Sequence, residues 1–332
     1  MNKISVIIEW KNQDLAEDKR AGAMLHTLRD QWLQITRSDA SPNSVAPGHL
    51  LDPCCEILFV YDSANARRNL ERRIADCFDL RADAFALRMI EGTGLNYYQM
   101  KQRGAEQATG SILVFLDSDV IPESGWLDAL LNAVFSEGVQ IVCGNTYIEP
   151  TGLLGKAFAL GWFFPLRSTR EDLECGARCY SNNIAFHRDV FERYPFDPIP
   201  GSTRAGMTGL IRKLDAEGIP IHKCHRAQVS HPPPNGLRHL IRRAMAQGRD
   251  NYLKSQRSGA TGAARLSIAA GVSWQRCSKG RHKTWTRHKV VDVSTLEIPM
   301  VMVIICFYYA FAGLGSLMTH IMPGFMTRRL QL

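Results

Sequence analysis

Two hydrophobic periods alternate along residues 1–145. Short continuous apolar runs, typical of buried strands, are separated by stretches in which apolar residues recur about every 3.6 positions, as in a helix. The predicted strands are Ser5–Glu9, Glu56–Tyr61, Ala84–Ile90, Ile112–Leu116 and Val139–Cys143. The predicted helices are Leu15–Ile35, Ala66–Phe78, Asn96–Ala108 and Trp126–Phe135. Strands that alternate with helices predict right-handed crossovers and an α/β fold with a mostly parallel, doubly wound sheet.

Acidic residues close three of the predicted strands. Glu9 ends the first, Asp62 follows the second, and Asp117 and Asp119 follow the fourth. Ligands of parallel sheets bind beyond the carboxyl ends of the strands, so we expect these side chains along one edge. Asp is also a common turn residue, and an Asp-x-Asp pair alone is more typical of an ordinary turn. Three acidic strand ends together favour a binding site.

Two carboxylates on a tight turn suit a hard divalent cation. Mg²⁺ and Mn²⁺ prefer oxygen ligands and often keep coordination positions open for a phosphate. The chain contains neither GxGxxG nor GxxxxGK[ST], the usual glycine cradles for dinucleotides and triphosphates. A nucleotide bound at this edge would therefore hold its phosphates through the metal.

The C-terminal part of the chain has a long apolar run. From Ile298 to Thr327 no Lys, Arg, Asp or Glu occurs, and about 20 apolar residues suffice to cross a bilayer. A buried hairpin of a soluble protein is the alternative. Residues 279–289 are strongly basic, whereas only Arg328 and Arg329 follow the run, so the positive-inside rule predicts a cytoplasmic N-terminal side. We expect a single-pass protein of the inner, cytoplasmic membrane.

Charge is distributed unevenly along the chain. Residues 236–332 contain fifteen Lys and Arg against three Asp and Glu, a formal charge of +12, although the whole chain carries only +8. Such segregation indicates either nucleic acid or an anionic membrane surface as the partner. Two predicted helices in this part, Leu237–Tyr252 and Ala263–Trp274, are suited to the membrane interface. The basic face of the first is also typical of a solvated helix face or of contact with a donor diphosphate. Because the chain lacks a known nucleic-acid module and has the apolar run, we expect a membrane and no nucleic acid.

Four segments resemble the family-2 glycosyltransferases of the GT-A fold, in their membrane-anchored bacterial type. They are SVIIEWKN (Ser5–Asn12), EILFVYDSAN (Glu56–Asn65), the block Gln102–Leu131 around LDSD, and YSNNIAFHRDVFERYPFD (Tyr180–Asp197). The resemblance covers roughly residues 3–232 and implies a Rossmann-like GT-A domain at residues 1–235. The basic residues and the apolar run add basic juxtamembrane helices at 236–295 and a transmembrane helix at 296–327. It also implies transfer of a sugar, with inversion, from a nucleotide-diphospho-sugar to a polysaccharide or lipid-linked glycan acceptor, with Mg²⁺ or Mn²⁺.

The resemblance assigns roles to the acidic strand ends. Glu9, where many relatives have Pro, would lie near the ribose of the donor. Asp62 would accept a hydrogen bond from the nucleobase of the donor. Asp117 and Asp119 match the metal motif, with Asp119 the more direct ligand and Asp117 also close to the donor. His231, which opens HPPPNG, would complete the metal shell as in some relatives, although a lone His is more often structural.

One departure from the family concerns the catalytic base. Relatives usually carry an acidic pair where this chain has Gly206 and Met207. An inverting displacement needs a base within reach of the acceptor hydroxyl. Asp197 and His187 are the expected substitutes, followed by His231. The departure also leaves open a non-catalytic protein that binds a nucleotide-sugar, or only a partner, at the membrane.

Overall fold

The computed structural model describes residues 3–12, 18–37, 56–79, 86–176, 179–202, 206–256 and 259–329. The chain divides into two compact units. The sheet unit comprises the chain up to Thr146 together with Arg167–Asp197 and Met207–His231. The helical unit comprises Tyr147–Leu166, Pro198–Gly206 and the chain from Pro232 onward. The expected boundary at residue 235 is close to the last of these, but residues 147–166 belong with the C-terminal helices.

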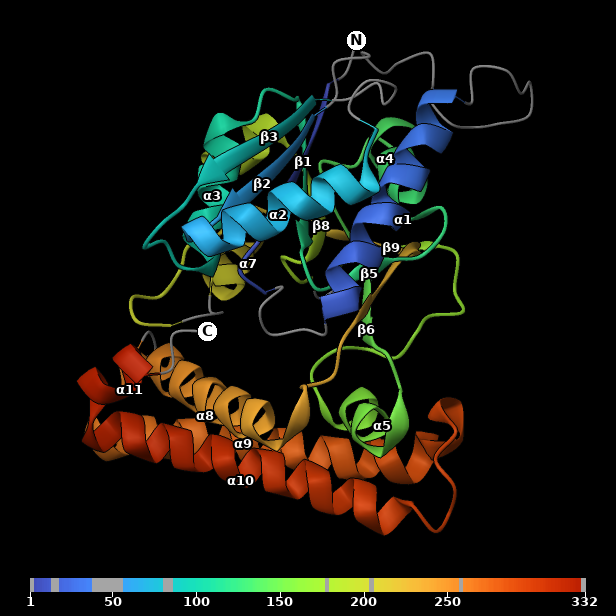
Figure 1. Cartoon of the computed structure of the whole chain (residues 1–332). Coiled ribbons are helices and arrows are strands. Elements are labelled where there is room, and N and C mark those ends of the chain that lie inside the picture. Colours follow the sequence, from blue (N-terminus) through green and yellow to red (C-terminus); the bar gives the residue numbers. More distant parts are fainter. Residues whose placement is uncertain are drawn as a thin grey trace. The chain divides into compact units, whose positions relative to one another are not determined.

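Buried apolar runs form the strands of the sheet unit. The strands are β1 Ile4–Glu9, β2 Glu56–Tyr61, β3 Ala86–Glu91, β4 Ile112–Asp117, β5 Ile121–Pro122, β6 Ile141–Ile148, β7 Leu173–Cys175, β8 Asn183–His187 and β9 His222–His231. In the described part of the chain they form one sheet of nine strands, in the order β3-β2-β1-β4-β8-β6-β9-β5, with β7 paired to β9 (Figure 1). The predicted α/β fold is confirmed.

Strand direction changes in the middle of the sheet. Strands β3, β2, β1 and β4 are mutually parallel, whereas β8 is antiparallel to both β4 and β6. Since β8 separates them, β6 runs in the same direction as β4. The sheet is therefore mixed, and the expectation of a mostly parallel sheet holds only for its first half. An apolar run indicates that a strand is buried, but it does not encode the direction in which the strand enters the sheet.

Helices cover both faces of this sheet. They are α1 Asp18–Arg37, α2 Ala64–Cys77, α3 Tyr97–Gln107, α4 Trp126–Phe135, α6 Arg188–Arg193 and α7 Gly206–Ala216. One apolar cluster contains residues of α1, α2 and α4, and a second contains residues of α3, α6 and α7. Helix α3 packs especially close to the sheet, because a Cβ at Gly104 would lie 2.4 Å from Cγ2 of Ile7.

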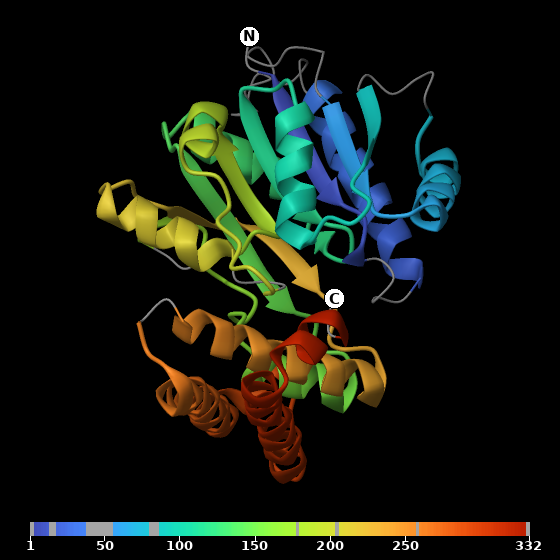
Figure 2. The same cartoon turned by 90° about the vertical axis from the view of Figure 1, so that its left-hand side faces the viewer.

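The helical unit is built around one apolar helix. Its helices are α5 Gly152–Gly161, α8 Gly236–Ser255, α9 Gly262–Arg287, α10 Ile298–Ile321 and α11 Pro323–Arg329. Figure 2 looks along α10, with α9 beside it and α8 crossing it. Glycines allow the close crossing of α8 and α10: a Cβ at Gly248 would lie 1.8 Å from the Ala312 oxygen, and one at Gly315 would lie 2.3 Å from the Met245 oxygen.

Helix α10 is the helix, among the described residues, that is long and apolar enough by length and composition to cross a membrane. It corresponds to most of the predicted apolar run. Helix α9 is longer than the predicted Ala263–Trp274, because it continues to Arg287 through the basic residues. Helix α8 agrees closely with the predicted Leu237–Tyr252.

Candidate functional site

The acidic strand ends meet at one edge of the sheet, as expected. Glu9 is the register partner of Asp117 across β1 and β4, and it pairs with Val60 of β2 on its other side. Asp62 follows β2 directly. Asp119 lies two residues beyond the end of β4 and is buried. Because these strands are parallel, their carboxyl ends place all four side chains along the same edge.

Asp117 is held inside the protein by three side chains. Nζ of Lys101 lies 2.7 Å from Oδ1 of Asp117, and both side chains are fully buried. The hydroxyl of Tyr97 donates to Oδ1 at 2.8 Å or to Oδ2 at 3.0 Å, and Nδ2 of Asn12 donates to Oδ2 at 3.2 Å. Both carboxylate oxygens therefore contact donors of the chain itself. This geometry orients the turn that carries Asp119.

Asp119 lies next to His231. Oδ2 of Asp119 is 3.8 Å from Nε2 of His231, and both side chains are almost completely buried. One arginine from α1 fixes the backbone on both sides of this pair: Nε of Arg20 donates to the Asp119 carbonyl at 2.7 Å. Nη2 of Arg20 donates to the carbonyl and the hydroxyl of Ser230, at 2.6 and 2.7 Å. Arg20 thus sets the separation of the two candidate ligands.

The Asp119–His231 pair fits a divalent cation. Two ligands of one octahedral ion with bonds of about 2.1 Å lie roughly 3 Å apart at adjacent positions and roughly 4 Å apart at opposite positions. The observed 3.8 Å lies between the two, so a shift of less than about 1 Å would bring the pair to adjacent positions. No three His, Cys, Asp or Glu side chains gather into a metal-sized group within the described residues. An ion held by this pair would therefore draw further ligands from the phosphates of a nucleotide and from water, as Mg²⁺ commonly does.

Glu9 and Asp62 differ in accessibility. Oε2 of Glu9 accepts hydrogen bonds from the backbone nitrogens of Lys11, at 3.1 Å, and Asn12, at 3.3 Å, and Glu9 is buried. These bonds shape the turn that presents Asn12 to Asp117. Asp62 is about a quarter exposed, and its Oδ2 lies 3.9 Å from Nζ of Lys11. Asp62 is therefore open to a ligand at this edge, whereas Glu9 chiefly supports the turn.

The two expected catalytic bases lie in different places. His187 pairs with Ile112 at the beginning of β4, whereas Asn183 pairs with Leu116 near its end. His187 therefore lies beside the amino-terminal end of β4. Asp117 is five residues further along that strand, or roughly 16 Å away. This position excludes His187 as the base, which corrects the sequence prediction. Oδ2 of Asp197 lies 3.4 Å from Nζ of Lys213 in α7, and Asp197 is one third exposed.

Sequence reasoning missed the groups that position the acidic residues. Lys101 occupies a buried position of α3, on the same side as Tyr97 and Ala105. A lysine within the apolar stripe of a helix is a signal in the sequence, because a buried ammonium group requires an acidic partner. No comparable signal identifies Arg20, since its partners are backbone groups more than 90 residues away in the chain.

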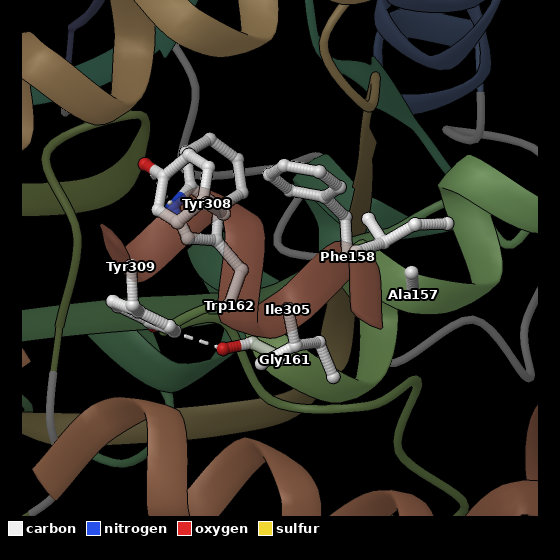
Figure 3. Close-up of a pocket in the computed structure, with 8 residues that line it drawn as sticks. Ala157, Phe158, Gly161, Trp162, Ile305, Tyr308 and Tyr309 are labelled. Atoms are coloured by element: carbon white, nitrogen blue, oxygen red, sulfur yellow. Dashed lines mark hydrogen bonds between the residues drawn. The ribbon is translucent and has the colours of Figure 1, made fainter. Parts of the chain in front are cut away.

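A pocket in the helical unit has a different character (Figure 3). It lies between α5 and α10, and its lining is Ala157, Phe158, Gly161, Trp162, Ile304, Ile305, Tyr308 and Tyr309. The Tyr309 hydroxyl donates to the Gly161 carbonyl at 2.9 Å, and Nε1 of Trp162 donates to the Tyr308 hydroxyl at 3.0 Å. The pocket has no carboxylate, imidazole or thiol in its lining, so it does not carry transfer chemistry.

A family model matches the part of the chain that carries most of the acidic edge. The model for glycosyl transferase family 2 matches residues 56–194. Residues 56–194 are a glycosyl transferase family 2 domain. The family 2 domain contains Asp62, Lys101, Asp117 and Asp119, whereas Glu9 and His231 lie outside the matched range.

Relatives of the family 2 domain are glycosyltransferases. Polypeptide N-acetylgalactosaminyltransferase 5 of Rattus norvegicus is 33% identical over 115 residues, which are 34% of this chain and 11% of that protein. Glycosyltransferase AglE of Haloferax volcanii is 32% identical over 89 residues, 26% of this chain and 29% of that protein. This chain thus spans less than a third of the length of either relative.

A solved structure shares the fold over nearly the whole chain. The mannosyltransferase PcManGT from Pyrobaculum calidifontis, in complex with GDP-Man and Mn²⁺, aligns with a TM-score of 0.55 and 13% identity. The alignment covers 98% of this chain and 88% of that chain. This likeness shows that the family 2 domain has the GT-A fold.

Proposed function

We propose that the protein is a metal-dependent glycosyltransferase that moves a sugar from a nucleotide-diphospho-sugar to a glycan or lipid-linked acceptor. The observation that carries this proposal is the buried Asp119–His231 pair, with ligand atoms 3.8 Å apart, beside the family 2 domain's acidic strand end. The relatives named glycosyltransferases, and the related fold solved with GDP-Man and Mn²⁺, support the same class of donor and metal.

Each residue of the acidic edge has a role in this proposal. Asp119 and His231 would hold Mg²⁺ or Mn²⁺, and when bound the cation stabilises negative charge on the leaving diphosphate. Asp117 would approach the donor as well, but its bonds to Lys101 and Tyr97 make orientation of the Asp119 turn its main task. Asp62 would contact the nucleobase, and Glu9 would lie near the ribose.

The acceptor hydroxyl requires a base from outside the usual acidic pair. Met207, at the corresponding position, is buried in the apolar cluster of α3, α6 and α7, and its backbone nitrogen lies 3.4 Å from the Tyr98 hydroxyl. Asp197 follows Phe196, whose ring packs on Tyr98 at 5.2 Å. We assign the base to Asp197, because it is the accessible carboxylate next to this aromatic cluster.

Membrane attachment is the second part of the proposal. One apolar helix near the C-terminus, α10, has the length and composition of a membrane segment. We propose that the helical unit attaches the protein to the inner, cytoplasmic membrane and that the sheet unit works on the cytoplasmic side. A lipid-linked acceptor would then be bound where its lipid resides. The sequence alone predicts that α10 crosses the bilayer once.

Turnover by the purified full-length protein tests the transferase. A panel of nucleotide-sugars with Mn²⁺ should contain a donor from which nucleoside diphosphate is released, and a chelator should stop the release. Asp119→Asn should abolish it, whereas Gln140→Asn, an exposed change elsewhere on the sheet unit, should not. Donor binding without any release or transfer would instead favour the second function, a non-catalytic nucleotide-sugar-binding protein. The observation behind this second function is that Met207 stands among apolar side chains at the position of the usual acidic pair.

A further inference from the structure

One face of α10 is exposed and apolar along its whole length. Its exposed residues include Met300, Val303, Phe307, Leu314, Leu317 and Ile321. They recur every three, four or seven positions, so they form a single stripe, here called the α10 stripe. Only 39% of the apolar window of α10 is buried, far less than in a helix at the core of a soluble protein. The α10 stripe therefore requires a partner.

The opposite face of α10 packs against a polar helix. Helix α8 crosses α10 at Gly248, whose carbonyl accepts a hydrogen bond from the Ser316 hydroxyl at 2.9 Å. Arg249 and Asp250 follow immediately in α8, both buried, with Nη2 of Arg249 lying 3.1 Å from Oδ1 of Asp250. The crossing is at Ala312–Ser316, in the C-terminal half of α10 and within about 10 Å of its midpoint at 1.5 Å per residue. Any membrane depth that Ala312–Ser316 reaches is therefore also reached by these charges.

A spanning α10 would bring α8 into the hydrocarbon. Helix α8 contains five basic residues and one acidic residue in twenty positions: Arg238, Arg242, Arg243, Arg249, Lys254 and Asp250. On insertion scales, one arginine at the middle of a bilayer offsets the gain from roughly five leucines. The α10 stripe is too short to compensate for several such residues. The packing of α8 on α10 therefore opposes a crossing and favours a helix that lies in the plane of the interface.

Helix α9 provides the side chains that suit an interface. It contains six Lys and Arg and no acidic residue. Trp274 and Trp285 are 71% and 69% exposed, and eleven residues, or three helical turns, separate them, so they share one face. Tryptophan rings and basic side chains are typical of the layer of lipid headgroups.

The tryptophans and the α10 stripe lie on the same side of the helix pair. Cys277 contacts Cys306 and Gly280 contacts Ile305, so α9 and α10 are antiparallel. Counted at roughly 100° per residue, Trp274 and Trp285 are turned roughly 110° away from the side of α9 that faces α10. For antiparallel helices this rotation brings them to the side on which the α10 stripe is exposed.

We propose that the α9–α10 pair docks in the plane of an anionic membrane surface, with the α10 stripe at the acyl boundary and Trp274 and Trp285 among the headgroups. Both ends of the chain then remain on one side of the membrane. The partner is an anionic lipid bilayer, because α9 carries only positive charge and the face beside it is apolar. This inference rests on the membrane part of the proposed function and is independent of the transfer chemistry.

Protease protection of terminal tags separates docking from crossing. The full-length chain, with one epitope tag at each end, is expressed in bacteria, and inverted inner-membrane vesicles and spheroplasts are prepared. We expect protease to remove both tags in inverted vesicles and neither in spheroplasts. Removal of the C-terminal tag alone in spheroplasts would show that α10 crosses, and recovery of the protein in the soluble fraction would show that it does not dock. Either result overturns the inference. Neither result bears on the transfer reaction, which donor turnover by the purified protein tests separately.

Binding to vesicles identifies the docking face. With vesicles of phosphatidylglycerol and phosphatidylcholine, the double variant Leu314→Asp, Leu317→Asp should bind at least about tenfold more weakly than the unmodified protein, because two apolar contacts are replaced by charges. The control Ser136→Asp, Gln140→Asp adds the same charge to exposed positions of the sheet unit and should bind within about threefold of it. Equal weakening by both pairs, or by neither, would contradict the assignment of the face.

Discussion

Lys101 and Asp117 form a fully buried ion pair, with Nζ of the lysine 2.7 Å from Oδ1 of the aspartate. The ammonium group also donates to the Leu116 carbonyl at 3.1 Å and lies 5.1 Å from the centre of the Tyr97 ring. These contacts join α3 to the end of β4. The first Asp of the Asp-x-Asp sequence is therefore fixed by the fold, and the second is left beside His231.

Removal of one partner should destabilise the protein strongly. Lys101→Met leaves the Asp117 carboxylate buried without its countercharge, and such changes usually lower the free energy of unfolding by about 3–5 kcal/mol. Denaturant unfolding measures the loss. The double variant Lys101→Met, Asp117→Asn removes both charges and should lose less than the single variant. A single variant within about 1 kcal/mol of the unmodified protein would mean that the pair is not important for stability.

Arg20 is expected to act as a positioning residue for the metal. It bonds the carbonyls of Asp119 and Ser230, so Arg20→Met should let the two candidate ligands separate. Loss of a group that orients ligands typically lowers metal affinity by about 10–100-fold. Titration with Mn²⁺ in the presence of nucleoside diphosphate measures this, and Arg20→Lys should recover part of it. If metal-free nucleotide binding falls equally, Arg20 supports the unit generally and not the metal ligands.

Glu56 should make stability depend on pH in the acid range. Burial raises the pKa of Glu56, but hydrogen bonds from Thr109, Ser5 and Arg88 outweigh it and lower the pKa from 4.5 to about 2. Because the folded pKa is the lower one, the stabilisation is complete above pH 4.5 and is lost as the pH falls through about 2. The shift corresponds to about 3 kcal/mol, to the order of magnitude.

Acid titration of unfolding compares the variants. Glu56→Gln should be less stable at pH 7 and should lose less stability than the unmodified protein between pH 4.5 and pH 2. Glu106→Gln, at an exposed position paired with Arg103, serves as the control and should follow the unmodified protein. Parallel curves for Glu56→Gln and the unmodified protein would exclude this role for Glu56.

The acidic residues at the strand ends can be predicted from the sequence better than the strands and side chains that surround them. Continuous apolar runs define β1, β2 and β4, and the parallel topology then gathers Glu9, Asp62, Asp117 and Asp119 at one edge. The positions of β8 and β6 cannot be predicted in this way, because direction depends on long-range packing. For the same reason the sequence alone could not exclude His187 as the catalytic base. Its register with Ile112 in the structure does so.

Asp197 is expected to act as the catalytic base. Asp197→Asn should leave donor binding intact while turnover falls by about 10²–10⁴, the usual contribution of a general base. His187→Ala is a suitable control, because it changes a candidate residue at the other edge of the sheet and should leave turnover unchanged. Normal turnover in Asp197→Asn would move the base to another residue, of which His231 is the first to test.

Asp119 and His231 are proposed to hold the cation that binds the donor diphosphate. Calorimetric titration of nucleoside diphosphate with and without Mn²⁺ tests this most directly. The unmodified protein should bind more tightly with Mn²⁺, because the cation joins Asp119 and His231 to the diphosphate. Asp119→Asn should bind with the same affinity whether or not Mn²⁺ is present, and its metal-free affinity should match that of the unmodified protein. An Asp119→Asn variant that keeps the full Mn²⁺-dependent gain in affinity would contradict the account.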